Sequence, residues 1–299
     1  MSAELRRIVA SLRERPLDFD APPAELRARF TAGMTALPFP ADVVSDKLTL
    51  GAVPALRVRA PGAAPDRALL FFHSGCYVFG SAEDHRGAVG ELSRGTGAEA
   101  YAVDYRLAPE HVFPAAVDDA LAAYRALLDR GLPPSCIAFA GMSSGGGLAV
   151  AALLAARDAG LPMPVAALLV SPWADLATEG GTIESNAARD PSIPPRGLRA
   201  MAARYLGGAS PRAPLASPVH ADLSGLPPLL IQVGGAEILL DDALRLARAA
   251  QAAGVAARVD TWPDMIHLWH VYGPILDEGR RALADGAAFL SRHLGEARR

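Results

Sequence analysis

The sequence predicts an α/β fold in which helices flank a mostly parallel central sheet. Short apolar runs recur along the chain and alternate with stretches of helical pattern. Most of these runs are continuously apolar, as expected for strands that helices cover on both faces. The predicted strands of this sheet span residues 68–73, 99–105, 135–141, 165–173, 227–234 and 256–262.

Helical patterns fill the intervals between these strands. Residues 115–131 and 240–254 each carry a helical spacing of apolar side chains and end at a glycine, which is a common helix terminator. Earlier in the chain, residues 46–50 and 55–61 flank Gly51 and alternate polar with apolar side chains. This pattern predicts an antiparallel pair at one edge of the sheet.

Two regions depart from the strand and helix alternation. Residues 1–45 have a helical pattern, and residues 175–215 are rich in Pro, Gly and Ser with one short helical stretch. We expect both to form a small helical cap over the carboxyl edge of the sheet. The first region would be the N-terminal part of the cap, and the second an insertion into a core of residues 46–299.

The composition of the 299 residues excludes several classes of protein. Hydrophobic residues make up 51% and charged residues 20% of the chain, and the formal net charge is −3. No basic cluster indicates nucleic acid, and no apolar run is long enough to cross a membrane. We therefore predict a cytoplasmic protein that binds a neutral or apolar small molecule. The two cysteines form no disulfide framework, and no ligand spacing predicts a metal.

The pentapeptide Gly141-Met142-Ser143-Ser144-Gly145 lies between a predicted strand and a predicted helix. In this context Gly-x-Ser-x-Gly is typical of a turn that exposes a nucleophilic serine, here Ser143. Side chains at 141 and 145 would collide with neighbouring backbone. Gly146 and Gly147 would let the helix approach the sheet and the substrate. The alternative is a glycine-rich turn whose serine is merely exposed.

A nucleophilic serine needs a histidine base and an acid that orients it. His267 follows the last predicted strand, and His270 is the alternative base. Glu237 directly follows the strand at 227–234 and is the preferred acid. Asp241, in the first turn of the next helix, remains open as the alternative. The other histidines near turns or helices, expected at the surface, are His85, His111, His220 and His293.

Four segments, FFHSGCYVFGS, VDYRLAPEHVFPAAVDDALAAYRAL, AGMSSGGGLA, and GGAEILLDDALRLA with WPDMIHLWH, are similar to motifs of one family. They resemble the hormone-sensitive-lipase-like branch of the α/β-hydrolase fold, bacterial carboxylesterases with a helical cap, in register from about residue 68 to 270. In that family the acid and the histidine are thirty residues apart, which favours Glu237. The resemblance also implies an ion-pair cluster of Asp104, Arg106 and Glu110.

The loop after the first central strand departs from the family. Its motif is His-Gly-Gly-Gly, whereas this chain has Ser74 and Cys76 at the first and third glycine positions. The oxyanion donors that the resemblance implies are therefore the amides of Gly75, Cys76 and Ser144. His73 is expected to orient this loop by hydrogen bonding. The acid is more often Asp in the family, so Glu237 is a substitution with one extra methylene.

These observations predict a serine carboxylesterase that acts on short-chain acyl esters without a cofactor. Alternatives are an ε-lactone hydrolase, an N-acetyl deacetylase, and a non-catalytic receptor, which the presence of His267 disfavours. The expected partner is a small ester substrate, and the resemblance allows a homodimer through the last edge strand. The predicted substrate-pocket residues are Tyr77, Met142, Leu206 and Leu268.

Overall fold

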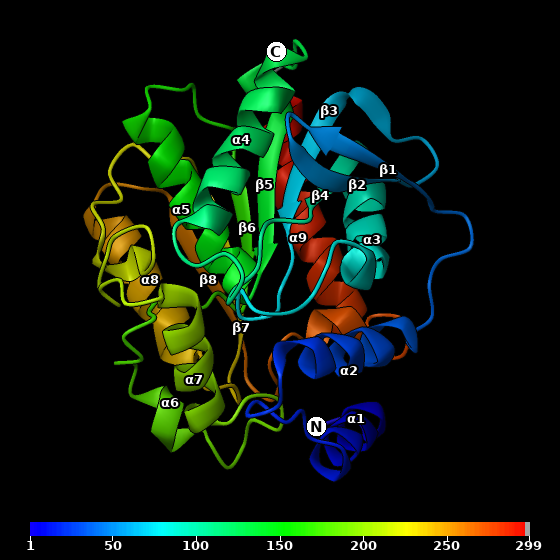
Figure 1. Cartoon of the computed structure of the whole chain (residues 1–299). Helices are drawn as coiled ribbons and strands as arrows, with labels where there is room; N and C mark the ends of the chain where they lie inside the picture. Colours follow the sequence, from blue (N-terminus) through cyan, green and yellow to red (C-terminus); the bar gives the residue numbers. More distant parts are fainter. Residues whose placement is uncertain (297–299) are drawn as a thin grey trace.

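A sheet of eight strands forms the centre of residues 1–296, the part of the chain that this computed structural model describes (Figure 1). Its strand order is β1-β2-β4-β3-β5-β6-β7-β8. β1 and β2 pair antiparallel, β2 pairs antiparallel with β4, and the other neighbours are parallel. The strands are β1 (Val44–Leu50), β2 (Val53–Arg59), β3 (Ala64–Phe72), β4 (Ala98–Val103), β5 (Ile137–Met142), β6 (Ala167–Val170), β7 (Leu229–Gly234) and β8 (Ala257–Trp262).

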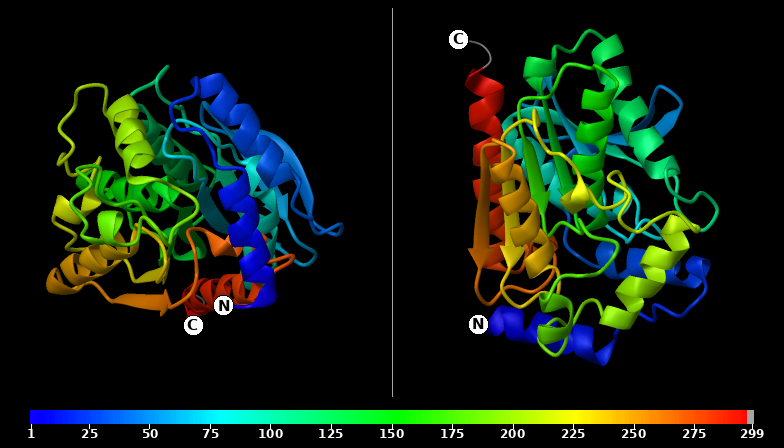
Figure 2. Two further views of the ribbon diagram at one scale, coloured as in Figure 1. Left: turned by 90° about the horizontal axis from the view of Figure 1, so that it is seen from below. Right: turned by 90° about the vertical axis from the view of Figure 1, so that its left-hand side faces the viewer.

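Helices cover both faces of this sheet (Figures 1 and 2). On one face α3 (Arg86–Thr96) and α9 (Asp277–Glu296) pack against each other and against the central strands. The opposite face carries α4 (Ala115–Asp129), α5 (Ser144–Asp158) and α8 (Leu240–Ala252). Burial on both sides is the reason that the central strands are continuously apolar. The predicted α/β class and the antiparallel edge pair are thereby confirmed.

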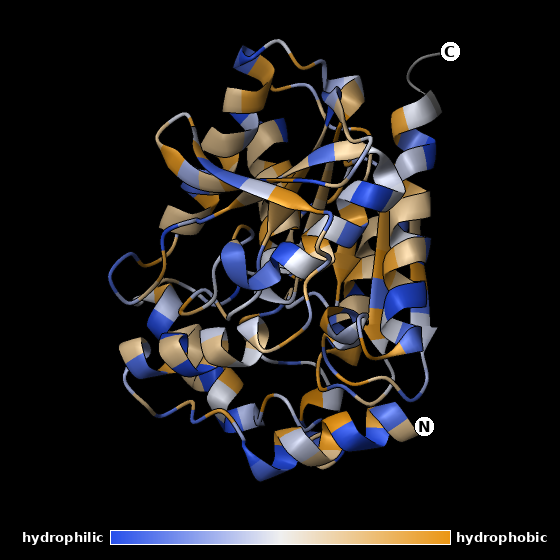
Figure 3. Cartoon of the chain, turned by 90° about the vertical axis from the view of Figure 1, so that its right-hand side faces the viewer, coloured by the Kyte–Doolittle hydropathy of each residue, from blue (hydrophilic) through white to orange (hydrophobic). Residues whose placement is uncertain are grey.

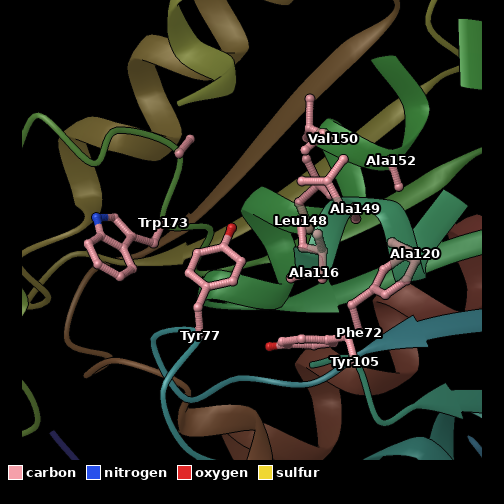
Figure 4. Packing of buried hydrophobic residues seen from close by; sticks show 14 of the residues in the cluster. Phe72, Tyr77, Tyr105, Ala116, Ala120, Leu148, Ala149, Val150, Ala152 and Trp173 are labelled. Atoms are coloured by element: carbon pink, nitrogen blue, oxygen red, sulfur yellow. The ribbon is translucent and has the colours of Figure 1, made fainter. Parts of the chain in front are cut away.

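The helix α5 is the most deeply packed helix around the site. Its residues from Ser144 to Leu154 are all buried. Figure 4 shows Leu148 and Ala149 packed among side chains from other elements, including Tyr77, Phe72 and Tyr105. A helix that is apolar all round is buried all round, so the start of α5 is held rigidly against the sheet.

The remaining helices lie beyond the carboxyl ends of the parallel strands (Figures 1 and 2). They are α1 (Ala3–Glu14), α2 (Pro23–Thr35), α6 (Thr182–Ser185) and α7 (Pro195–Leu206). Leu5 and Ile8 of α1 pack with Ile266 and Trp269, which lie in the segment after β8. Two distant parts of the chain therefore meet above one edge of the sheet.

Hydrophilic and hydrophobic residues alternate along α1 (Figure 3). Such a helix buries one face and exposes the other. Within residues 1–296, no helix combines the length and the hydropathy that crossing a membrane requires.

Candidate active site

Ser143 lies at the turn between β5 and α5. Its φ of 54° and ψ of −119° place a non-glycine residue in a rarely populated region, which costs about 1–3 kcal/mol. The turn is held in place by two hydrogen bonds. The amide of Ser143 donates to the carbonyl of Val170 at 2.8 Å, and that of Trp173 donates to the Ser143 carbonyl at 3.0 Å.

The glycines around Ser143 are required by close backbone approach. A Cβ at Gly141 would lie 2.0 Å from the carbonyl oxygen of Gly145, and one at Gly145 would lie 2.1 Å from that of Phe72. A Cβ at Gly147 would lie 2.1 Å from the carbonyl oxygen of Trp173. The expected collisions at 141 and 145 are present. Gly147, however, makes room for the loop after β6 and not for the sheet.

Ser143, His267 and Glu237 form a continuous line of hydrogen-bonded side chains. His267 Nε2 lies 3.0 Å from Ser143 Oγ, and His267 Nδ1 lies 2.6 Å from Glu237 Oε2. The histidine comes from the loop after β8, and the glutamate from the loop after β7. The carboxyl ends of adjacent parallel strands meet at one edge of a sheet, which brings together residues far apart in the sequence.

The alternatives for the acid and the base lie elsewhere. Asp241 Oδ2 accepts a hydrogen bond from the amide of Gly181 at 2.9 Å. His270 is fully buried, and its Nε2 lies 3.0 Å from Gln232 Oε1. Burial lowers the pKa of His270 to about 3. Neither side chain hydrogen bonds with Ser143 or His267, so the geometry favours Glu237 and His267.

The pKa of His267 is raised above 6.5. Burial of the imidazole acts to lower this pKa, but the hydrogen bond and the charge of Glu237 together act more strongly to raise it. The carboxyl group of Glu237 is fully buried and also accepts a hydrogen bond from Ser171 Oγ at 2.9 Å. A buried carboxylate beside an imidazole stabilises the protonated form of the ring.

Ser171, Asn186 and Asp190 support the acid and the base but were not predicted from the sequence. Ser171 Oγ donates to Glu237, and Asn186 Nδ2 donates to the Glu237 carbonyl at 2.9 Å. Asp190 Oδ2 accepts from the amide of Ile238 at 2.9 Å, and its charge acts to raise the pKa of His267. Ser171 directly follows β6, and that position was the signal available in the sequence.

Within residues 1–296 the backbone N–H groups of Gly75, Cys76 and Ser144 donate no hydrogen bond to a backbone carbonyl. Gly75 has a φ of 126°, and a Cβ there would lie 1.9 Å from the carbonyl oxygen of Phe79. Cys76 also has a positive φ of 53° and is 2% exposed. Burial raises the pKa of its thiol to about 12, so Cys76 is a neutral side chain at ordinary pH.

Two buried histidines fix the loop that carries Gly75. His73 Nδ1 donates to the carbonyl of Ser74 at 2.7 Å, and the His73 ring stacks on Tyr105 with centroids 4.1 Å apart. His85 was expected at the surface, and this prediction is wrong: His85 is 1% exposed. Its Nε2 lies 2.8 Å from Ser74 Oγ, and burial lowers its pKa to about 4. The hydrogen bond with the Ser74 hydroxyl offsets the cost of burying this imidazole nitrogen.

A cavity of about 770 Å³ opens onto Ser143 and His267. Its walls come from α1, α2, the loop of Gly75 and Cys76, the segment around Ile193, and the segment from Leu268 to Ile275. Most of these side chains are apolar. The cavity thus gives an uncharged organic molecule access to the line of hydrogen-bonded side chains.

The predicted pocket residues lie in different places. Leu268 lines the cavity, whereas Tyr77, Met142 and Leu206 are not among its lining residues. Tyr77 is buried and stacks on Tyr205 with ring centroids 3.9 Å apart (Figure 4 shows its place beside Trp173). Met142 is buried in the core cluster on the α3 and α9 side. The lining from α1 and α2 was not predicted, because nothing in the sequence indicates where these helices dock.

The ion-pair cluster of Asp104, Arg106 and Glu110 is not present. Arg106 pairs with Asp119 at 2.8 Å, and Glu110 pairs with Arg27 of α2 at 2.7 Å. Asp104 Oδ1 accepts from the amide of Ala82 at 2.7 Å. Each charged side chain therefore has a partner from a different segment, and together they join the surrounding loops.

Among the described residues, one group has the geometry of metal ligands: Asp175, Glu179 and His220. The guanidinium of Arg245 lies 2.6 Å from Asp175 Oδ2, and His220 Nε2 lies 3.3 Å from Asp175 Oδ1. The arginine already neutralises the buried carboxylate of Asp175. This group is an ion-pair network that links α8 to the loop after β6.

Comparison with known proteins agrees with this architecture. The family described as alpha/beta hydrolase fold matches residues 69–271. An acetyl-hydrolase of Streptomyces hygroscopicus is 50% identical over 270 residues, which are 90% of this chain and 88% of the relative. An esterase of Acinetobacter venetianus is 35% identical over 228 residues, 76% of this chain and 75% of the relative.

Solved structures of esterases are also similar to this chain over almost its whole length. A crystal structure of an esterase from the bacterial hormone-sensitive lipase family has a TM-score of 0.96 and 45% identity, covering 99% of both chains. The esterase EstE5, soaked with p-nitrophenyl butyrate, has a TM-score of 0.95 and 43% identity, covering 99% of this chain and 100% of that chain.

The sheet, the serine turn and the cavity at its carboxyl edge define an α/β hydrolase. The chain belongs to the α/β-hydrolase family, in its bacterial hormone-sensitive-lipase-like branch of esterases. It is a carboxylic ester hydrolase.

Proposed function

We propose that this enzyme hydrolyses short-chain acyl esters with Ser143 as nucleophile, His267 as base and Glu237 as the acid that orients the base. The observation that carries the proposal is the line from Ser143 Oγ through His267, 3.0 Å and 2.6 Å long at its two steps, at the floor of an accessible cavity. Nucleophile, base and orienting group within hydrogen-bond reach are what acyl transfer requires.

The proposed reaction has two stages. His267 Nε2 accepts the proton of Ser143 as Oγ attacks the ester carbonyl, and the amides of Gly75, Cys76 and Ser144 stabilise the oxyanion. The ester C–O bond then breaks, the leaving alcohol takes the proton from His267, and an acyl-enzyme remains. Water, deprotonated by His267, attacks this intermediate. The bond to Ser143 then breaks, Ser143 Oγ takes the proton back from His267, and the acid is released.

The preference for short acyl groups rests on a related structure and on the cap. EstE5, similar over nearly its whole chain, was soaked with the ester of a four-carbon acid. In this chain, we propose that α1, α2 and the segment 175–215 are one cap, because α1, α2 and Ile193 line the cavity above Ser143.

A second candidate, removal of an acetyl group from an amide, is favoured by the 50% identical acetyl-hydrolase. The same nucleophile, base and oxyanion donors would serve it, with an amine as leaving group. Nothing in the described residues favours lactone hydrolysis, which stays a prediction. The receptor alternative is not retained, since the relatives are esterases.

The replacement Ser143→Ala tests the proposal. We expect kcat/KM for p-nitrophenyl butyrate to fall at least about 10⁴-fold, because the nucleophile is lost. Ser224 is exposed and does not line the cavity, so Ser224→Ala is the control and should retain full activity. A fluorophosphonate should label Ser143 in the wild type, as peptide mass spectrometry would detect. Labelling of another residue, or an active Ser143→Ala variant, would contradict the proposal.

Two further expectations stay predictions. β8 is a free edge of the sheet within the described chain, and it is the strand through which two copies would pair in a homodimer. The cytoplasmic location also stays a prediction.

A further inference from the structure

The charged side chains that line the cavity above Ser143 are all arginines. They are Arg7, Arg15 and Arg29, and no Asp or Glu of residues 1–296 is among the lining residues. Arg7 and Arg15 lie eight residues apart on one face of α1 and its C-terminal cap, with Ser11 midway between them and also in the lining. Arg29 comes from α2.

These arginines form the solvent end of the cavity. All three are exposed, whereas Ser143 is 2% and His267 5% exposed. Between the two ends the lining is apolar, with Phe30, Met34, Ile193, Leu268 and Val271 as examples. The cavity therefore runs from a positively charged entrance through an apolar section to the reacting groups.

The positive charge at this entrance is largely uncompensated. Within residues 1–296 the guanidinium groups of Arg7 and Arg15 form no hydrogen bond or ion pair, and that of Arg29 reaches Glu25 only at 3.9 Å. Other arginines of the surface have close partners: Arg57 pairs with Asp46 at 2.9 Å and Arg94 with Asp42 at 2.8 Å. Three unpaired or weakly paired cations at one entrance contrast with a net charge of −3 for the whole chain.

We propose that the preferred esters carry an anionic group, a carboxylate or a phosphate, separated from the reacting carbonyl by an apolar chain. The apolar section binds the chain, and the guanidinium groups at the entrance bind the anion. Arginine suits both anions, because its planar fork donates two parallel hydrogen bonds. This inference rests on the proposed function. It differs from the expectation of a neutral or apolar ligand, which was based on the net charge and not on its distribution.

The test compares esters that share a leaving group and differ at the far end of the acyl chain. The probes are p-nitrophenyl octanoate, the mono-p-nitrophenyl ester of octanedioic acid, the p-nitrophenyl ester of 8-phosphonooxyoctanoic acid, and an ester ending in trimethylammonium. At low ionic strength we expect kcat/KM for the anionic esters to exceed that for the cationic ester by about tenfold, since exposed ion pairs contribute modestly. The carboxylate and phosphate probes separate the two sources of anion. The preference should shrink in 0.5 M NaCl, because salt screens charges.

Two variants, each with three arginines replaced by glutamine, test whether the arginines at the entrance cause the preference for anionic esters. In R7Q/R15Q/R29Q the ratio of anionic to cationic rates should fall to about one, with the loss in KM rather than in kcat. In R6Q/R13Q/R248Q the protein loses the same charge outside the cavity, and the ratio should stay as in the wild type. A wild-type ratio near one, or equal loss in both variants, overturns the inference. p-Nitrophenyl butyrate, assayed in parallel, distinguishes the two failures. If it is not hydrolysed, the proposed function itself fails; if it is hydrolysed and none of the longer esters is, only the inference is overturned.

Discussion

Ser143 is held in a strained backbone conformation by the hydrogen bonds that its turn forms with neighbouring backbone. Its φ of 54° persists where backbone hydrogen bonds join the turn to Val170 at the end of β6 and to Trp173 in the loop after it. The same turn points the side chain toward His267 and leaves the amide of Ser144 at the start of α5, where a helix favours negative charge. Strain at this residue and accessibility of its hydroxyl have one structural cause.

The pair of His267 and Glu237 makes a prediction about pH. The proposed base must be neutral, and its pKa is raised above 6.5 mainly by the glutamate, against the lowering effect of burial. The wild-type kcat/KM should therefore fall with decreasing pH through an apparent pKa above 6.5. In Glu237→Gln the raising partner is lost, so the acid limb should move to lower pH while the rate at its plateau falls by up to about 10⁴-fold.

The measurement is a profile of kcat/KM for p-nitrophenyl butyrate from pH 5 to 9. Asp241→Asn is the matched control, since Asp241 was the alternative acid and lies outside the site. It should retain the wild-type acid limb. A profile that shifts in Asp241→Asn and not in Glu237→Gln would show that Asp241, and not Glu237, orients the base.

The start of helix α5 is positioned by glycines that allow close contact with the end of β3 and with the loop after β6. Gly145 approaches the end of β3 and Gly147 approaches the loop after β6. Each such glycine costs about 1 kcal/mol of helix propensity relative to alanine. The close approach that they permit sets the distance between the serine turn and the loop of Gly75.

Gly145→Ala should disrupt this contact. The added Cβ would lie 2.1 Å from the carbonyl oxygen of Phe72 and 2.4 Å from that of His73, both rigid backbone atoms. We expect a thermal midpoint several degrees lower and a kcat/KM at least about a hundredfold lower, because the oxyanion donors move apart. Gly181→Ala is the control: it has ordinary φ and no atom within 4 Å of the new Cβ. Equal behaviour of the two variants in thermal unfolding and activity would contradict the close-approach explanation.

At the scale of the whole molecule, the site is completed by segments from both ends of the chain. α1 packs on Ile266 and Trp269, next to His267, and also lines the cavity. α1 is thus linked physically to the base. Loosening α1 should affect both the cavity and the position of the imidazole.

Leu5→Ala tests this link. Leu5 is fully buried in the cluster with Met265 and Ile266, so its truncation should lower the free energy of unfolding by about 2–4 kcal/mol. We expect a parallel loss of kcat/KM and faster amide hydrogen exchange in residues 3–14 and 263–272. Ala10→Ser, at an exposed position of α1, should change none of these. Normal activity despite rapid exchange of α1 would show that the helix is dispensable for catalysis.

Much of the fold followed from local pattern. Continuous apolar runs predicted the parallel strands, and the glycines around Ser143 predicted the turn. Strand ends at 234 and 262 predicted where an acid and a base would meet. These features can be predicted because the spacing of apolar residues, the residue types in a turn and the position of a strand end each depend on only a few neighbouring residues.

The sheet, the nucleophile turn and the order of the site residues along the chain could all be predicted from local sequence patterns. Other features arise only when the chain folds: His85 is buried against Ser74, Arg106 and Glu110 take separate partners, and α1 and α2 place arginines at the entrance of the cavity. Local preference depends on near neighbours in the sequence, whereas burial and charge pairing depend on segments as many as 263 residues apart that meet only in the folded chain.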